Sequence, residues 1–212
     1  MKLSNMQLIL STAAVFVIVI FFGNFVFLLN NHDYTSEFQK LKVNETIANN
    51  VVDFVNGKST LSSEFNSRES SHLEDVKNLF TAIKRFYYIS SLILLIMSIY
   101  LFTIKKFNQI IPKSLIVSGA ASLLLLFIIF LLSFSFTEIF NLIHKPFFAS
   151  NTWIFPADSL LITTFPEQFF KDFAKNLFLL IFVNSAVFLG IGLFIRKKFK
   201  QRNKTYPDDY PS

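Results

Sequence analysis

The stretch QLILSTAAVFVIVIFFGNFVFLL, residues 7–29, contains no Asp, Glu, Lys or Arg. It is long enough to cross the hydrocarbon core of a bilayer as a helix, which takes about 20 residues. Three more uncharged stretches follow at 86–104, 115–136 and 176–195. Lipid admits only helices or closed barrels, and these apolar runs lack the alternation of a barrel strand. The sequence therefore predicts an all-α membrane protein with four transmembrane helices.

The first of these stretches follows Lys2 and therefore has the outline of a secretory signal. Its apolar run is longer than that of a signal peptide, which has about 7–15 apolar residues. No small-x-small cleavage site follows Leu29. We expect the segment to be retained as a helix.

The distribution of positive charge predicts the orientation of the helices. Ten of the 20 Lys and Arg residues lie at the N-terminus, between the second and third spans, and in the tail, together with only two acids. Because Lys and Arg concentrate on the cytoplasmic side, we expect both termini to be cytoplasmic in a multi-pass protein of the cell membrane. The segments 30–85 and 137–175 carry ten basic and 12 acidic residues. We expect these two loops to form a small outer domain.

The overall composition excludes several classes of function. The net charge of +6 follows from the cytoplasmic bias, not from a basic face interleaved with aromatic side chains, so nucleic acid is not a partner. The absence of cysteine rules out disulfides, thiol nucleophiles and thiolate metal sites. The best acid–base candidates are the three histidines, His32, His72 and His144, which all lie in the outer segments. His32 directly follows the first span, where a polar residue usually just marks the helix end.

The first outer segment contains two predicted helices. Residues 44–56 begin at a capping Asn44, end at Asn56-Gly57 and carry apolar side chains at helical spacing, which predicts a short amphipathic helix. The second helix should begin at His72, since Ser71-x-x-Glu74 matches a capping box, and continue into the second span.

A position in the first helical turn would affect the chemistry of His72. The positive end of the helix dipole favours a neutral imidazole that can accept a proton. Asp75, three residues later on the same face, could orient the ring or raise its pKa. The alternative is a solvated helix start, whose charges (Arg68, Glu69, Glu74, Asp75 and Lys77) pair only with one another.

The second outer segment, 137–175, is unusually apolar for a loop. Its many Phe residues and the single Trp153 indicate that it lies against the outer leaflet, where aromatic side chains anchor. Residues 158–165 are expected to form a short helix, and a further helix should begin near Glu167 and lead into the fourth span. The notable polar residues are His144, Asn151, Asp158 and Glu167.

Two long motifs in the outer segments resemble a known family. They are NSRESSHLEDVKNLF at 66–80 and HKPFFASNTWIFPADSLLI at 144–162, the second followed by FPEQFF at 165–170. With the four spans, they make the chain similar to the lipoprotein intramolecular transacylases of bacteria. The resemblance implies an enzyme that takes a lipoprotein with a diacylglyceryl group on its N-terminal cysteine. It moves the sn-2 acyl chain to the cysteine α-amine, which gives the lyso form.

The resemblance also implies the site residues. The two motif histidines, His72 and His144, would be the catalytic pair at the outer leaflet. From the chemistry of the reaction, we expect His72 to act as base and His144 as acid or second base. Imidazoles suit this work because they titrate near neutrality. Orienting, substrate-binding or oxyanion-stabilising roles fall to Arg68, Asp75, Asn151, Trp153, Asp158 and Glu167. Since amine and ester belong to one substrate, the reaction calls for neither a nucleotide nor a metal. The other partner is membrane lipid.

Two alternatives remain open from the residues alone. A metal-dependent membrane hydrolase could use His72, Asp75, His144 and either Asp158 or Glu167 as ligands, although no tight His-x-x-x-His spacing is present. A non-enzymatic membrane protein could use the outer segments to bind a partner.

Overall fold

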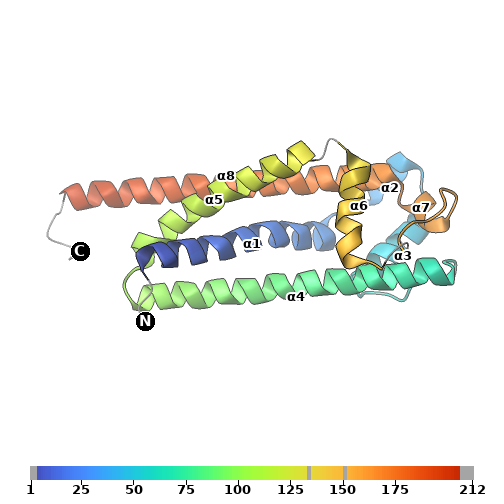
Figure 1. Cartoon of the computed structure of the whole chain (residues 1–212), viewed down its shortest axis with the longest axis horizontal. Coiled ribbons are helices and arrows are strands. Elements are labelled where there is room, and N and C mark those ends of the chain that lie inside the picture. The colour runs from blue at the N-terminus through green and yellow to red at the C-terminus, as the bar shows by residue number, and fades with distance from the viewer. Residues whose placement is uncertain (1–3, 133–134, 150–151, 206–212) are drawn as a thin grey trace. The chain divides into compact units, whose positions relative to one another are not determined.

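The computed structural model describes residues 4–132, 135–149 and 152–205 of the 212-residue chain. All regular elements among these residues are helices, which Figure 1 shows in chain order. They are α1 (Asn5–Asn31), α2 (Thr35–Leu41), α3 (Glu45–Val55), α4 (Ser67–Thr103), α5 (Phe107–Leu132), α6 (Phe136–Phe147), α7 (Leu160–Thr164) and α8 (Glu167–Thr205). Within this described part, α1, α4, α5 and α8 are long and apolar enough to cross a membrane. The predicted all-α fold with four candidate membrane spans is confirmed.

The chain folds into two compact units. The bundle unit comprises Met1–Asn24, Tyr87–Ile128 and Leu179–Ser212, and the histidine unit comprises Phe25–Phe86 and Ile129–Phe178. Each of the four long helices contributes residues to both units. His32, His72 and His144 all belong to the histidine unit, which therefore contains all the candidate acid–base imidazoles.

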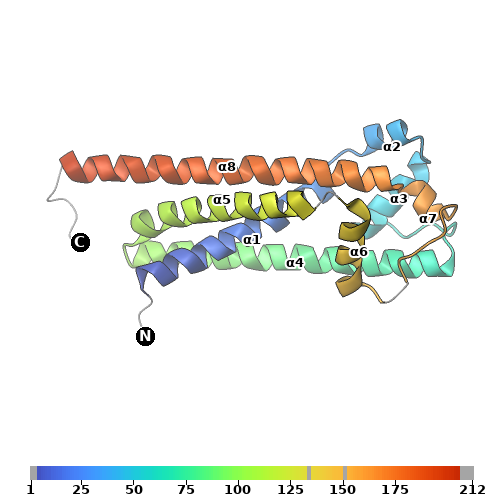
Figure 2. The ribbon, with the colours of Figure 1, turned by 45° about the horizontal axis from the view of Figure 1, so that its top comes forward.

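In the bundle unit, parts of α1, α4, α5 and α8 lie side by side, as Figures 1 and 2 show. Small residues allow α5 and α8 to approach closely. A Cβ atom added at Gly119 of α5 would lie 2.7 Å from both the backbone nitrogen of Leu189 and the backbone oxygen of Ser185 on α8. A hydrogen bond of 2.6 Å from the side-chain amide of Asn184 to that of Asn24 joins α8 to α1. Such packing and polar contacts hold helices together where lipid provides no hydrophobic drive.

The core of the histidine unit is aromatic and is built partly by α3. This helix begins after Asn44, whose side chain accepts two backbone N–H groups of the first turn, and ends at Val55, with Asn56 as its C-terminal cap. Gly57 follows with φ of +77°, a left-handed conformation that favours glycine. The amphipathic helix predicted for 44–56 is therefore confirmed. Its apolar face joins the buried cluster of Tyr34, Phe38, Ile47, Ala48, Val51, Phe54, Val55, Phe65, Leu73, Leu161, Phe165 and Phe169.

A reciprocal cap starts α4 at Ser67. The side-chain oxygen of Asn66 accepts hydrogen bonds from the backbone N–H groups of Arg68 and Glu69, each at 3.0 Å. In return, Glu69 Oε2 accepts the N–H of Asn66 at 3.1 Å. This arrangement is a capping box, which satisfies N–H groups that the first helical turn leaves without partners.

The predicted start of this helix at His72 is wrong. The chain uses the earlier of two possible capping boxes, not the one formed by Ser71 and Glu74, and His72 lies in the second turn of α4. Because the effect of the helix dipole is confined to the first turn, it does not account for the protonation state of His72.

His144 lies on a helix, whereas the sequence predicted a loop. α6 carries it and is steeply inclined to α4 in both views (Figures 1 and 2). Pro146 is tolerated because it lies in the last turn of α6, and the helix closes with a 3.0 Å hydrogen bond from the N–H of Phe148 to the carbonyl of His144. Phe140 and His144, four residues apart, share one face of the helix.

The segment after α6 leads to the short helix α7. Its cap is Ser159, whose hydroxyl accepts the N–H of Ile162 at 3.4 Å. This confirms the short helix expected within 158–165, with the narrower bounds Leu160–Thr164. α8 then begins at Glu167 as predicted, directly after Pro166.

Candidate functional site

The structure brings two of the three histidines together. The rings of His72, on α4, and His144, on α6, are stacked with centroids 6.3 Å apart and an interplanar angle of 26°. His32 is engaged elsewhere, since its Nε2 lies 2.7 Å from Glu37 Oε1. The pair predicted from the two motifs is therefore a spatial pair, although its members are 72 residues apart in the chain.

The ring of His144 is held in one orientation. Its Nδ1 lies 2.7 Å from the backbone oxygen of Phe140. A carbonyl oxygen can only accept a hydrogen bond, so Nδ1 carries the proton and the neutral ring keeps its free electron pair on Nε2. The ring also stacks on that of Phe140, with centroids 3.9 Å apart, and contacts Trp153 at 4.9 Å. His144 is thus oriented as a proton acceptor through Nε2.

His72 is more deeply buried than His144 and has a different environment. Only 7% of the residue is exposed. Its ring contacts those of Phe148 and Phe155, with centroids at 4.9 and 5.5 Å. Its Nδ1 is buried and bonds no described residue. The imidazole therefore lies in an aromatic enclosure that disfavours its charged form.

Both histidines have lowered pKa values. Burial, and to a lesser extent the charge of the nearby His144, lower the pKa of His72 to about 4 against a smaller opposing effect of Asp75. Burial also lowers the pKa of His144, partly offset by its hydrogen bond to Phe140. His72 lies in the charged first part of α4, outside the uncharged stretch 86–104. At neutral pH both rings are uncharged and able to accept a proton.

Two of the predicted supporting residues lie at this site. Trp153 contacts His144, as described, and Phe140 at 6.0 Å. Arg68 donates a 2.7 Å hydrogen bond from Nη2 to the carbonyl of Ile154, and its guanidinium carbon lies 5.1 Å from the ring centroid of Phe155. Arg68 thus contacts the segment 153–155, in which Trp153 contacts His144 and Phe155 contacts His72.

The other predicted residues are less closely connected to the pair. Asp75 is exposed and acts on His72 only through its charge. Asp158 is exposed, and no hydrogen bond or ion pair joins it to a described residue. Glu167 forms an ion pair with Lys171 on its own helix. Asn151 lies outside the described residues.

One residue of this region, Glu69, was not among the site residues expected from the sequence. The sequence placed it only in the alternative of a solvated helix start, whereas 1% of the residue is exposed. Its Oε1 accepts the backbone N–H of Leu161, at the start of α7, at 3.0 Å. The pattern Asn66-x-x-Glu69 was a signal for its capping role; nothing local indicated the contact with Leu161.

The ligand set suggested for a metal-dependent hydrolase is not assembled in the described part of the chain. There, no three His, Asp or Glu side chains are grouped so that they could hold a metal ion. The imidazole pair is surrounded by aromatic rings instead of carboxylates.

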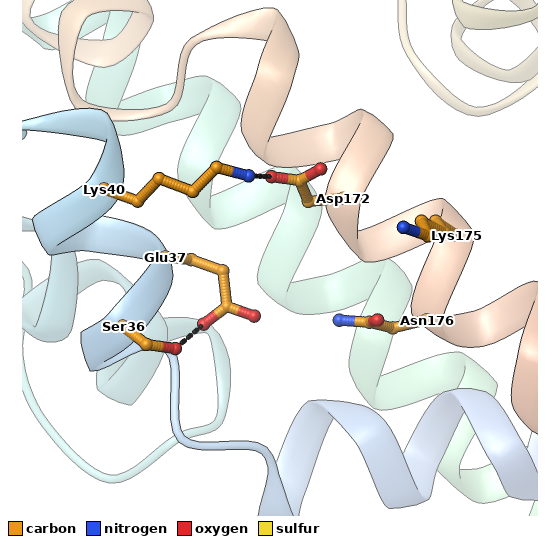
Figure 3. Close-up of a pocket in the computed structure, with 6 residues that line it drawn as sticks. All are labelled: Ser36, Glu37, Lys40, Asp172, Lys175 and Asn176. Atoms are coloured by element: carbon orange, nitrogen blue, oxygen red, sulfur yellow. Dashed lines mark hydrogen bonds and ion pairs between the residues drawn. The ribbon is translucent and has the colours of Figure 1, made fainter.

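A separate polar pocket of about 260 Å³ lies between α2 and α8 (Figure 3). Its lining residues are Ser36, Glu37, Lys40, Asp172, Lys175 and Asn176. Lys40 Nζ pairs with Asp172 Oδ2 at 3.0 Å, and the Ser36 hydroxyl donates to Glu37 at 2.9 Å. The pocket contains neither His72 nor His144, so the candidate active site is the enclosed imidazole pair.

Comparison with known proteins decides the family. The family model described as lipoprotein intramolecular transacylase Lit matches residues 2–170. The chain belongs to this family. Membership confirms the resemblance that rested on the two motifs, and it makes the protein an acyltransferase that acts on lipoproteins. With the four apolar helices, it is also a multi-pass membrane protein.

Solved structures of a Lit transacylase have the same fold. The membrane-integral lipoprotein intramolecular transacylase Lit from Bacillus cereus is 19% identical, with a TM-score of 0.76 over 93% of this chain and 98% of that chain. Two other structures of it, one with a histidine-to-arginine and one with a histidine-to-alanine substitution, have TM-scores of 0.70 and 0.73. No curated protein matches the chain.

Proposed function

We propose that this transacylase moves the sn-2 acyl chain of a diacylglyceryl lipoprotein to the α-amine of its N-terminal cysteine. The amine nitrogen forms a bond to the ester carbonyl carbon, and the bond from that carbon to the glyceryl oxygen breaks. The amine releases one proton and the departing glyceryl oxygen takes up one, so the reaction consumes and releases no net proton. The reaction is therefore an isomerisation that needs no added acyl donor.

The observation that supports this mechanism best is the stacked pair of His72 and His144 in an aromatic enclosure. A proton has to move from nitrogen to oxygen within one substrate, and two adjacent imidazoles can accept and return it. A positive charge on His144 lowers the pKa of His72. Simultaneous protonation of the two rings is therefore disfavoured, and the pair carries at most one extra proton. The aromatic walls exclude water, which would hydrolyse the ester instead.

The environments of the two rings favour an assignment of roles opposite to that expected from sequence. The hydrogen bond from Nδ1 of His144 to Phe140 leaves Nε2 free and partly offsets the effect of burial on its pKa. His144 is therefore the better base for the amine proton. With a pKa of about 4, a protonated His72 would be the stronger acid toward the departing glyceryl oxygen.

Mass spectrometry of a substrate lipoprotein tests the reaction type. We expect its N-terminal lipopeptide to keep the mass of the diacylglyceryl form while one ester becomes an amide on the α-amine. Lipopeptides from cells with and without this protein should differ only in fragmentation. A gain of one acyl mass would indicate an intermolecular N-acyltransferase, and a loss of one would indicate a hydrolase. Either result would reject the proposal.

The charge distribution supports cytoplasmic termini and an active site at the outer leaflet. This predicts that cysteine introduced at the exposed Ser63, in the outer segment, reacts with an impermeant thiol reagent in intact cells. Cysteine at the exposed Asn108, near the basic residues between the second and third spans, should react only after lysis. The chain has no cysteine of its own, so any label on this protein reports the introduced cysteine. The reverse pattern would refute this orientation.

A further inference from the structure

We infer that Arg68 and Glu69 are positioning residues that fasten the 153–161 segment to α4 and thereby set the spacing of the two histidines. The inference rests on the proposed function, because it assigns these two residues to the same imidazole pair. It adds Glu69, whose side-chain hydrogen bonds go to the backbone of Asn66 and Leu161 and not to either imidazole.

The two residues hold the two ends of the segment. Arg68 donates to the carbonyl of Ile154 at 2.7 Å, and Glu69 accepts the N–H of Leu161 at 3.0 Å. They are neighbours in the first turn of α4, one turn before His72. The segment is thus tied at both ends to the helix that carries one of the histidines.

Between these ties, the segment supplies walls for both imidazoles. Phe155 contacts His72 with ring centroids 5.5 Å apart, and its ring lies under the guanidinium of Arg68. Trp153 contacts His144 with centroids 4.9 Å apart. A displacement of the segment would therefore move contacts of both rings at once.

Glu69 is suited to a fixed tie. Burial of a carboxylate is costly unless hydrogen bonds compensate for it. With 1% exposure, Glu69 accepts one N–H from Asn66 on Oε2 and one from Leu161 on Oε1. Bonds from N–H groups to an ionised carboxylate are stronger than those between neutral groups. Glutamine has nearly the same shape, but its NH₂ group cannot accept an N–H, so Glu69→Gln loses one of the two bonds.

The test combines kinetics with the fluorescence of Trp153, the single tryptophan of the chain. For Glu69→Gln we expect kcat to fall by about tenfold or more with KM within about threefold, because misplaced catalytic groups affect the transition state more than binding. We expect Trp153 emission to shift to longer wavelength and its quenching by acrylamide to increase. Arg68→Ala, which alters an exposed residue, should act in the same direction and provides the test if Glu69→Gln does not fold.

The matched control is Glu74→Gln, which removes an exposed carboxylate from the same helix whose partner is Lys77 at 3.6 Å. It should leave both kcat and Trp153 emission unchanged. Unchanged Trp153 emission in Glu69→Gln and Arg68→Ala would overturn the inference, as would full activity in a variant whose emission has shifted. The fluorescence of Trp153 tests the tie between α4 and the 153–161 segment without any turnover. Full activity of His72→Ala would instead contradict the proposed function, so the two failures can be told apart.

Discussion

Replacement of His72 or His144 by alanine should lower the rate of acyl transfer by about 10²-fold or more, the range typical of a lost general acid or base. The expectation rests on their stacked rings, with centroids 6.3 Å apart, among the aromatic rings of Phe148, Phe155 and Trp153. The measurement is single-turnover conversion of a diacylglyceryl lipopeptide in detergent or nanodiscs, followed by the appearance of the blocked α-amine.

The double variant distinguishes a pair that acts as a unit from two independent residues. If one proton passes between the rings, loss of either ring removes most of the effect, and His72→Ala with His144→Ala should cost far less than the product of the single effects. His32→Ala is the matched control because His32 bonds Glu37 instead of the pair. Full activity of a folded His72→Ala protein would exclude the proposed mechanism.

The fold was predictable from sequence wherever the signal was local. The uncharged stretches need no tertiary information, because a span must be apolar over its own length. α3 was also predictable, since its cap at Asn44, its stop at Asn56 and its apolar face all lie within a dozen residues. Residue type and location in the outer segments indicated three histidines as acid–base candidates, and the two motifs selected His72 and His144 among them.

The start of α4 was predicted wrongly because contacts between residues far apart in the chain determine it. Both Asn66-x-x-Glu69 and Ser71-x-x-Glu74 fit a capping box, and the contact of Glu69 with Leu161, 92 residues away, distinguishes the first. The local sequence does not indicate that contact, so the buried carboxylate of Glu69 was grouped with the charges of a possible solvated helix start. α6 was missed because its apolar side chains were attributed to a loop lying against the outer leaflet; Pro146, in the last turn, leaves the rest of the helix intact.

Substitution of Gly119 by alanine should destabilise the packing of α5 against α8. An added Cβ would lie 2.7 Å from backbone atoms of Ser185 and Leu189 on α8. Backbone cannot rotate away as a side chain can, so the two helices must separate. Overpacking of this kind costs about 1–3 kcal/mol, and in lipid the lost van der Waals contact is a main source of helix association. Unfolding by SDS or heat in mixed micelles measures the loss.

The same helix pair provides a second test site and a control. At Gly192 of α8 an added Cβ would lie 2.8 Å from the backbone oxygen of Pro112 on α5, whereas at Gly190 it would meet nothing within 4 Å. Gly192→Ala should therefore destabilise the protein as Gly119→Ala does, and Gly190→Ala should be neutral or slightly stabilising, because alanine favours a helix more than glycine does. Equal stability of all three variants would mean that α5 and α8 do not approach this closely. The 29 phenylalanines make the chain apolar enough for lipid, but two glycines determine how near these two helices lie.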